Sequence, residues 1–121
     1  MTNTRQHLGQ WGESLAANYL IQKGYNILER NARTAHGEID LVAQQDGITI
    51  FVEVKTRTST AYGQPEEAIT SAKKAHLLAS AQAYLQNHPE LDGDWQIDVL
   101  AIRQSKNEPP EIVHFENAVG G

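Results

Sequence analysis

Two runs of alternating apolar and polar residues, separated by Asp46-Gly47, constrain this chain more than any other feature. Asp-Gly favours the two-residue type I′ turn that joins antiparallel strands, because both central residues of that turn need a positive φ. The sequence therefore predicts a β-hairpin. If Gln45 and Ile48 flank the turn, the same pairing continued outward sets Asp40 directly opposite Glu53.

This pairing would bring two carboxylates together. Directly opposed side chains have Cβ atoms about 5 Å apart, and two negative charges at that separation repel by roughly 3 kcal/mol at an effective dielectric of about 20. A divalent cation would remove the repulsion, and Mg²⁺ prefers oxygen ligands together with water and substrate phosphate. Lys55 and Phe51 share the face of Glu53, which indicates a partly covered cleft. The alternative is a solvated sheet face on which Asp40, Glu53 and Lys55 form cross-strand salt bridges.

The rest of the chain predicts one α/β domain. Apolar residues at helical spacing predict a helix over 8–23, along which Leu8, Trp11, Leu15 and Tyr19 share one stripe. A strand is expected over 25–30, a long helix over 65–87 that could be broken at 70–71, and two further strands over 95–102 and 112–115. This order is typical of a mixed five-stranded sheet flanked by helices. We expect a single domain over 1–121, with its core at about 9–116 and a frayed tail at 117–121.

Composition excludes several classes of protein. The chain has no cysteine, so disulfides, thiolate metal sites and cysteine nucleophiles are excluded. Its five histidines include no pair spaced i, i+4, so a zinc site is not expected. The first residues form no apolar leader and no stretch approaches about 18 apolar residues, which predicts a cytoplasmic protein without a membrane partner.

The net charge of −5 argues against tight, non-specific binding of nucleic acid. The excess of acid is local, however. Residues 1–89 hold eight basic and eight acidic side chains, whereas residues 90–121 hold two basic and seven acidic ones. Weak, salt-sensitive contact with phosphates through the first part of the chain remains compatible with this distribution.

Gly37-Glu38-Ile39-Asp40 followed by Glu53-Val54-Lys55 resembles the restriction-endonuclease-like PD-(D/E)XK nuclease superfamily, in which an Asp on one strand precedes Glu-x-Lys on the next. Ile39 stands where the superfamily's name has proline. Similarity over roughly residues 9–102 also resembles the YraN family of small bacterial endonuclease-like proteins, related in fold to the archaeal Holliday junction resolvases. The residues that carry this second resemblance are Gly12-Glu13, Asn31, Arg33, Arg57, Glu67-Ala68 and Lys73.

The resemblance implies a restriction-endonuclease-like fold and a metal-dependent endonuclease acting on DNA, with branched or flap DNA as the expected substrate. It implies that Asp40 and Glu53 bind Mg²⁺ or Mn²⁺, that Lys55 orients or activates the attacking water, and that Glu13 assists. A homodimer would suit symmetric cutting. The alternative is a catalytically weak or silent module of the same fold that binds nucleic acid or a protein partner.

Three basic residues are candidate contacts for nucleic acid: Arg33, Arg57 and Lys73. Arg57 continues the Glu53 face and would suit bidentate binding of phosphate, although it could equally be an edge-strand charge. Lys73 lies in the inward stripe of the second helix, where it would either extend its ammonium group to solvent or reach a site carboxylate. Glu13 could be an ordinary carboxylate on a helix surface, and Asp98, mid-strand among apolar residues, is expected to be a hydrogen-bonded structural carboxylate.

Overall fold

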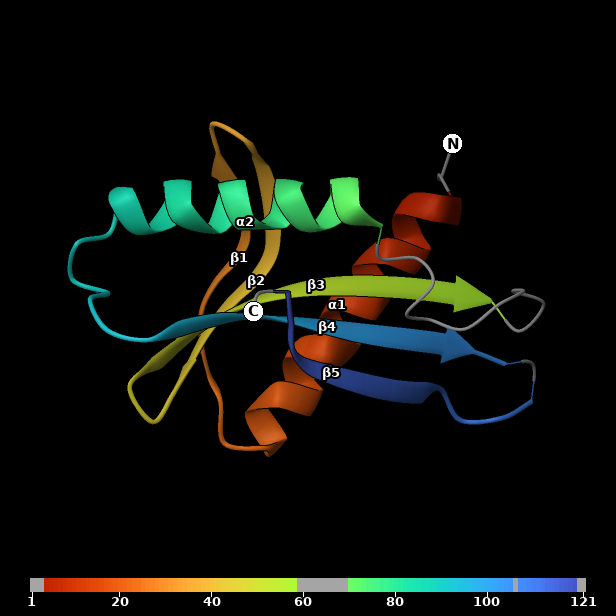
Figure 1. The fold of residues 1–121 in the computed structure, drawn as a ribbon. Coiled ribbons are helices and arrows are strands. Elements are labelled where there is room, and N and C mark those ends of the chain that lie inside the picture. The colour runs from red at the N-terminus through yellow and green to blue at the C-terminus, as the bar shows by residue number, and fades with distance from the viewer. Residues whose placement is uncertain (1–3, 59–69, 106, 120–121) are drawn as a thin grey trace.

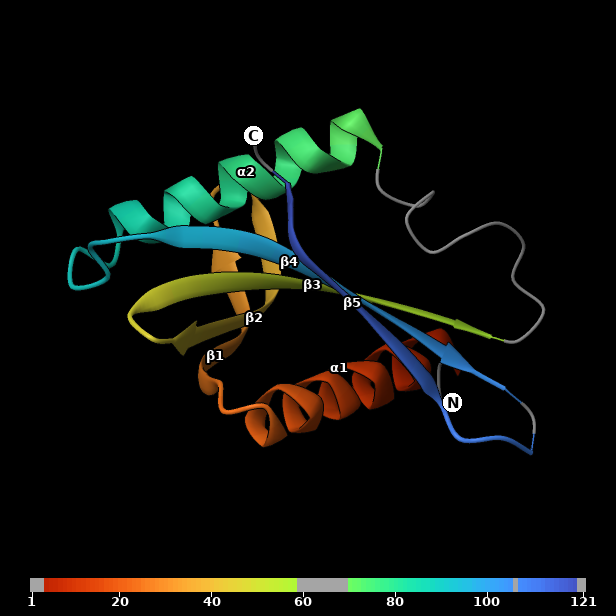
Figure 2. The same cartoon turned by 60° about the horizontal axis from the view of Figure 1, so that its bottom comes forward.

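The computed structural model of the protein describes residues 4–58, 70–105 and 107–119. Five strands form one sheet in the order β1-β2-β3-β4-β5, and two helices cover its opposite faces (Figures 1 and 2). The elements are α1 (Thr4–Gln22), β1 (Asn26–Thr34), β2 (Gly37–Gln45), β3 (Ile48–Thr58), α2 (Ser71–Gln86), β4 (Trp95–Gln104) and β5 (Glu111–Val119). Strands β3 and β4 are parallel and the other neighbours are antiparallel. The expected mixed five-stranded α/β sheet is therefore confirmed, and it is consistent with a restriction-endonuclease-like fold.

The predicted hairpin is formed by β2 and β3. Asp46 has a φ of 53° and Gly47 a φ of 79°, as the turn requires. Pairing runs from Gln45↔Ile48 to Leu41↔Val52, which is the predicted register. One step further along, where Asp40 and Glu53 lie, β2 leaves β3, and the β1–β2 hairpin rises away from the rest of the sheet (Figure 1).

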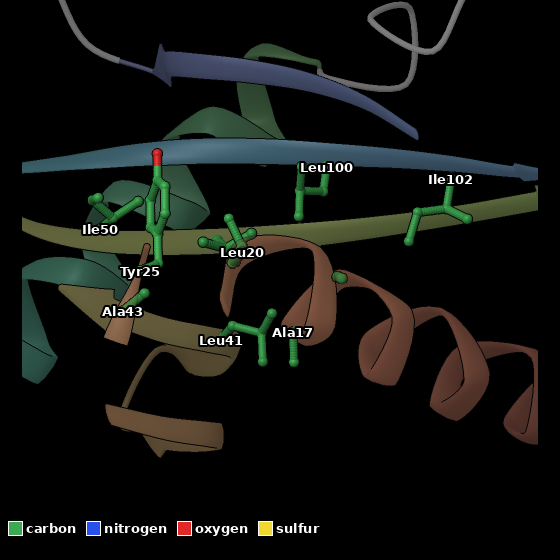
Figure 3. Close-up of a cluster of buried hydrophobic side chains, with 10 residues drawn as sticks. Ala17, Leu20, Tyr25, Leu41, Ala43, Ile50, Leu100 and Ile102 are labelled. Carbon is green, nitrogen blue, oxygen red and sulfur yellow. The ribbon is translucent and has the colours of Figure 1, made fainter. Parts of the chain in front are cut away.

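One face of the sheet is covered by α1, whose buried side chains join those of β2, β3 and β4 in a single cluster (Figure 3). Three members of the predicted stripe, Trp11, Leu15 and Tyr19, are partly buried and pack against this cluster. The buried residues of α1 are Gly12, Ala16, Ala17 and Leu20. Small residues at this face let the helix backbone lie close to the strands, which a stripe of large side chains would prevent.

The other face is covered by α2, which contributes Leu77, Ala81 and Tyr84 to a second cluster. Phe51 of β3 lies at its centre, 2% exposed, with its ring centroid 5.7 Å from that of Tyr84. The side chain of Thr70 caps α2 by accepting a hydrogen bond from the backbone N–H of Lys73 at 3.1 Å. The helix thus begins at the predicted break, and the expected helical residues 65–69 lie outside the described part of the chain.

The end of the chain differs from the prediction. Residues 117–119, expected to be part of a frayed tail, belong to β5. Val119 is only 4% exposed and pairs with Ile97 of β4, so burial holds this segment in the sheet. Among the described residues, no helix is long and apolar enough to cross a membrane.

Gly12→Ala should destabilise the protein by about 1–3 kcal/mol, because a Cβ at this position would collide with Thr56 Oγ1 on β3. Gly9→Ala is a matched control on the same helix: within the described part of the chain, no atom beyond the adjoining residues and helix backbone lies within 4 Å of its added Cβ, so it should be neutral or stabilise by up to about 1 kcal/mol. Urea unfolding of both variants measures the difference. Equal stability of the two would contradict a close approach of α1 to β3.

Candidate functional site

Side chains from three elements line one cleft with a volume of about 590 Å³. Glu13 comes from α1, Asp40 from β2 and Glu53 from β3. The cleft lies where β2 has left β3 and the N-terminal half of α1 runs beside β3. Its other lining residues are Leu8, Gly9, Val54, Thr56, Arg57 and Thr58. Three carboxylates that are far apart in the sequence therefore share one cavity.

Asp40 is fixed by the neighbouring strand, since its Oδ2 accepts a hydrogen bond from the backbone N–H of Val54 at 2.8 Å. Burial, and next the negative charge of Glu53, raise the pKa of Asp40 to about 7, although the Val54 bond and the positive charge of Lys73 act in the opposite direction. Burial and the neighbouring carboxylate thus make a negative charge at Asp40 costly. A cation in the cleft would lower that cost.

Glu53 is the most strongly paired carboxylate of the cleft. Its side chain is 8% exposed, and its Oε1 lies 3.1 Å from Lys73 Nζ and 3.6 Å from Lys55 Nζ. Because breaking up a nearly buried ion pair leaves an uncompensated charge, these lysines hold the Glu53 side chain in place. The structure thus places both predicted lysines beside a predicted carboxylate, and Lys73 reaches the site rather than extending only to solvent.

Glu13 is held by an amide that connects it to a further carboxylate. With its side-chain nitrogen turned toward the acids, Asn31 donates to Glu13 Oε1 at 2.9 Å and to Glu38 Oε1 at 3.1 Å. Burial raises the pKa of Glu13, and the Asn31 bond opposes that shift. Glu38 was not among the predicted site residues. Its position two residues before Asp40, on the same strand, was the available signal.

The two predicted arginines differ in their positions. Arg57 is exposed and lines the cleft. Arg33 is 89% exposed at its side chain, lies 4.0 Å from Glu38 and lines a separate surface depression on the β1–β2 hairpin. Arg57 therefore shares the cleft with the carboxylates, whereas Arg33 lies outside it.

A second group that could hold a metal ion lies on β4 and β5, where one ligand atom from each of Asp98, His114 and Glu116 falls within 4.8 Å of the others. None of the three lines the cleft. Asp98 is fully buried and accepts hydrogen bonds from Gln96 Nε2 and Asn117 N, each at 2.9 Å, and its Oδ2 lies 2.7 Å from His114 Nε2. Asp98 is thus the hydrogen-bonded carboxylate that was expected.

The sequence-based argument against a histidine metal site rested on spacing along helices, and it missed this group. The sequence signal for this group is the two-residue side-chain period of a β-strand. His114 and Glu116 are two residues apart on β5, so their side chains point to the same face of the sheet. Only the antiparallel pairing of β4 with β5 brings Asp98 to that face.

Comparison with known proteins places the chain in a family. The sequence pattern of Uncharacterised protein family UPF0102 matches residues 12–102. A UPF0102 protein of Syntrophomonas wolfei subsp. wolfei is 50% identical over 113 residues, which cover 93% of this chain and 97% of the relative. Another, from Roseiflexus castenholzii, is 48% identical over 121 residues and 98% of each chain. The chain belongs to the UPF0102 family, so its resemblance to the YraN family is confirmed.

Among solved structures, SfsA of Pyrococcus furiosus, determined in complex with Ca²⁺, aligns with 96% of this chain at 16% sequence identity and a TM-score of 0.38. The chain spans 65% of the length of that protein.

The pKa of Asp40 predicts a dependence of stability on pH. Because the folded value of about 7 lies above the ordinary value of 3.8, the folded protein binds more protons than the unfolded chain between these values, so Asp40 lowers the free energy of unfolding as pH rises through that range. Asp40→Asn keeps an oxygen that can accept from Val54 and removes the titration. Its stability should therefore change less with pH than that of the wild type.

Urea unfolding at several pH values between about 4 and 7.5 measures this slope. Asp46→Asn, in the exposed turn, is the matched control and should keep the wild-type slope, because Asn also tolerates a positive φ. A slope for Asp40→Asn equal to that of the wild type would contradict the raised pKa.

Proposed function

We propose that this chain is a metal-dependent endonuclease that hydrolyses phosphodiester bonds in DNA, with branched or flap DNA as its substrate. One observation carries the proposal: three carboxylates converge in one cleft, and two lysine ammonium groups lie against one of them. Anionic oxygens can bind a divalent cation, and the cationic groups can contact a phosphate. The site combines these anionic and cationic groups on a mixed α/β sheet. This combination supports a role in phosphodiester hydrolysis more than a purely structural role for the charges.

The residues of the cleft fit Mg²⁺ or Mn²⁺, since these ions prefer oxygen ligands. Asp40 and Glu53 would bind the ion, and the raised pKa of Asp40 supports this assignment, because it marks negative charge in need of a partner. When bound, the ion would supply positive charge to the phosphate oxygens and favour ionisation of the attacking water.

The chain's own residues position the reactants. The Val54 N–H and the Lys73 ammonium group hold Asp40 and Glu53 in place before substrate binds, so little rearrangement is needed. Lys55 adjoins Glu53 and would orient the attacking water. Hydrolysis adds this water at phosphorus and breaks one P–O ester bond, leaving a phosphate monoester and a free hydroxyl. Glu13 would assist from the edge of the cleft, where burial raises its pKa.

Arg57 would contact the DNA backbone beside the cleft, and Arg33 would contact it farther along the β1–β2 hairpin. Such contacts are electrostatic and independent of base sequence, so binding should weaken as salt concentration rises. DNA is therefore the proposed partner. A homodimer is proposed only as the assembly that symmetric cutting of a branched substrate would need.

A second function has one observation in its favour. The Oε1 of Glu53 already has two ammonium groups as partners, and these would compete with a cation for the carboxylate. If the lysines kept Glu53 from binding a cation, the protein would bind nucleic acid or a protein partner without cleaving DNA. A measurement of metal binding distinguishes these two proposed functions.

Mg²⁺ or Mn²⁺ should raise the midpoint of thermal unfolding of the wild type, because an ion that binds only the folded state stabilises it by about 2.7 kcal/mol at 100 times its Kd. Asp40→Asn should abolish this rise, whereas the Asp46→Asn control should keep it. Calorimetry with increasing metal concentration measures the shift. A wild type that shows no shift would favour the non-catalytic module.

Asp40→Ala and Glu53→Ala should each abolish Mg²⁺-dependent cleavage without unfolding the protein, and Lys55→Ala should slow it roughly a hundredfold or more. The assay uses linear, nicked, flapped and four-way DNA and structured RNA, with Mg²⁺ and with Mn²⁺. Circular dichroism of each variant confirms that it is folded. Undiminished cleavage by either carboxylate variant would defeat the proposed roles.

A further inference from the structure

We propose that Lys55, Arg57 and Arg103 form a phosphate-binding track across β3 and β4, which holds the backbone of the DNA strand next to the cleft. The inference rests on the proposed function and adds Arg103, a residue that the sequence does not single out. Arg103 is one of only two basic residues in the acidic segment 90–121.

The register places these side chains on one face. In the parallel pairing of β3 with β4, Arg57 lies directly opposite Arg103, and Lys55 lies opposite Ala101. Paired positions on neighbouring strands point to the same side, and so do residues two apart on one strand. Phe51 of β3 faces α2, so all three cations lie on the α2 side of the sheet.

This part of the face extends beyond α2. Both views show β3 and β4 running past the N-terminal end of that helix (Figures 1 and 2). The three cations line one small surface pocket there, together with Ala101, Ile102, Val113 and one carboxylate, Glu111. Ala101 is paired with Lys55 on one side and with Val113 on the other, and its small side chain leaves room between them.

Lys55 Nζ lies 3.6 Å from Glu53 Oε1, so the charge of the track that has no ion-pair partner among the described residues is that of its two arginines. Like charges at directly paired positions are destabilising, yet Arg57 and Arg103 occupy such positions. Within residues 4–58, 70–105 and 107–119, no carboxylate forms an ion pair with either arginine at 4.0 Å or less. Glu111 pairs with Arg103 in the sheet register without making such a contact. A polyanion lying across both arginines would remove the repulsion.

The track is continuous with the cleft, because Arg57 lines both. Lys55 and Arg57 are about 7 Å apart along the strand, which is comparable to the distance between successive phosphates of a nucleic-acid strand. A strand whose scissile phosphate lies at Glu53 and Lys55 would therefore present its next phosphates to Arg57 and Arg103.

Binding of fluorescently labelled flap DNA by the full chain tests the track, with Ca²⁺ replacing Mg²⁺ and a gel showing that the DNA stays intact. Arg103→Gln should weaken binding roughly five- to tenfold at 0.1 M salt and reduce the slope of log K against log salt by about 0.9, the value for one phosphate contact. Arg103→Lys should largely keep the wild-type slope. Lys74→Gln removes the same charge from an exposed position on α2 and should leave the slope unchanged.

Thermal unfolding of Arg103→Gln without DNA is the control for folding, and its midpoint should equal or exceed that of the wild type, because a like-charge pair has been removed. If Arg103→Gln binds with the wild-type affinity and slope while the wild type cleaves DNA, the track is overturned and the endonuclease remains. If the wild type neither binds nor cleaves DNA, both proposals are overturned together.

Discussion

The register of the β2–β3 hairpin is the constraint on which the site depends. A shift of one residue would move every side chain of a strand to the other face of the sheet, so burial of Leu41 and Val52 fixes the pairing firmly. The same register carries Asp40 and Glu53 to the point where the strands separate. The apolar core thus holds together two carboxylates that would otherwise move apart.

The helices complete the site from opposite faces of the sheet. Gly12 permits the close approach of α1 to β3, and the next residue, Glu13, is thereby brought into the cleft. On the other face, Thr70 begins α2 at a position that places Lys73 in its first turn. A cation is unfavourable at this positive end of a helix. The contact with Glu53 offsets that cost, which indicates that the position of Lys73 is set by the site and not by the helix.

The sequence predicted those parts of the structure that depend on local rules. The turn at Asp46-Gly47 and the pairing register follow from backbone geometry alone, and the order of elements follows from periodicity. The burial of small residues on α1 was not predicted, because apolarity marks large side chains, whereas close approach selects small ones such as Gly12 and Ala16. The group around Asp98 and His114 was missed because it depends on the pairing of β4 with β5, which no spacing within one element reveals.

Local arrangement, and not net charge, decides which ligand this surface can attract. The excess negative charge comes from residues 90–121, but the fold places the charged residues of this segment in different surroundings. Asp98 is buried and hydrogen-bonded near His114, while Arg103 of the same strand lies beside Arg57 of β3. Glu111 of β5 is paired with Arg103 and lines the same pocket, but the cations of this pocket outnumber it. Because exposed charges more than about 8–10 Å apart are largely screened at physiological salt, a phosphate near Arg57 and Arg103 would interact mainly with these nearby groups and not with the more distant acids. An acidic chain can in this way present a locally cationic surface, and its net charge weakens long-range attraction without preventing contact.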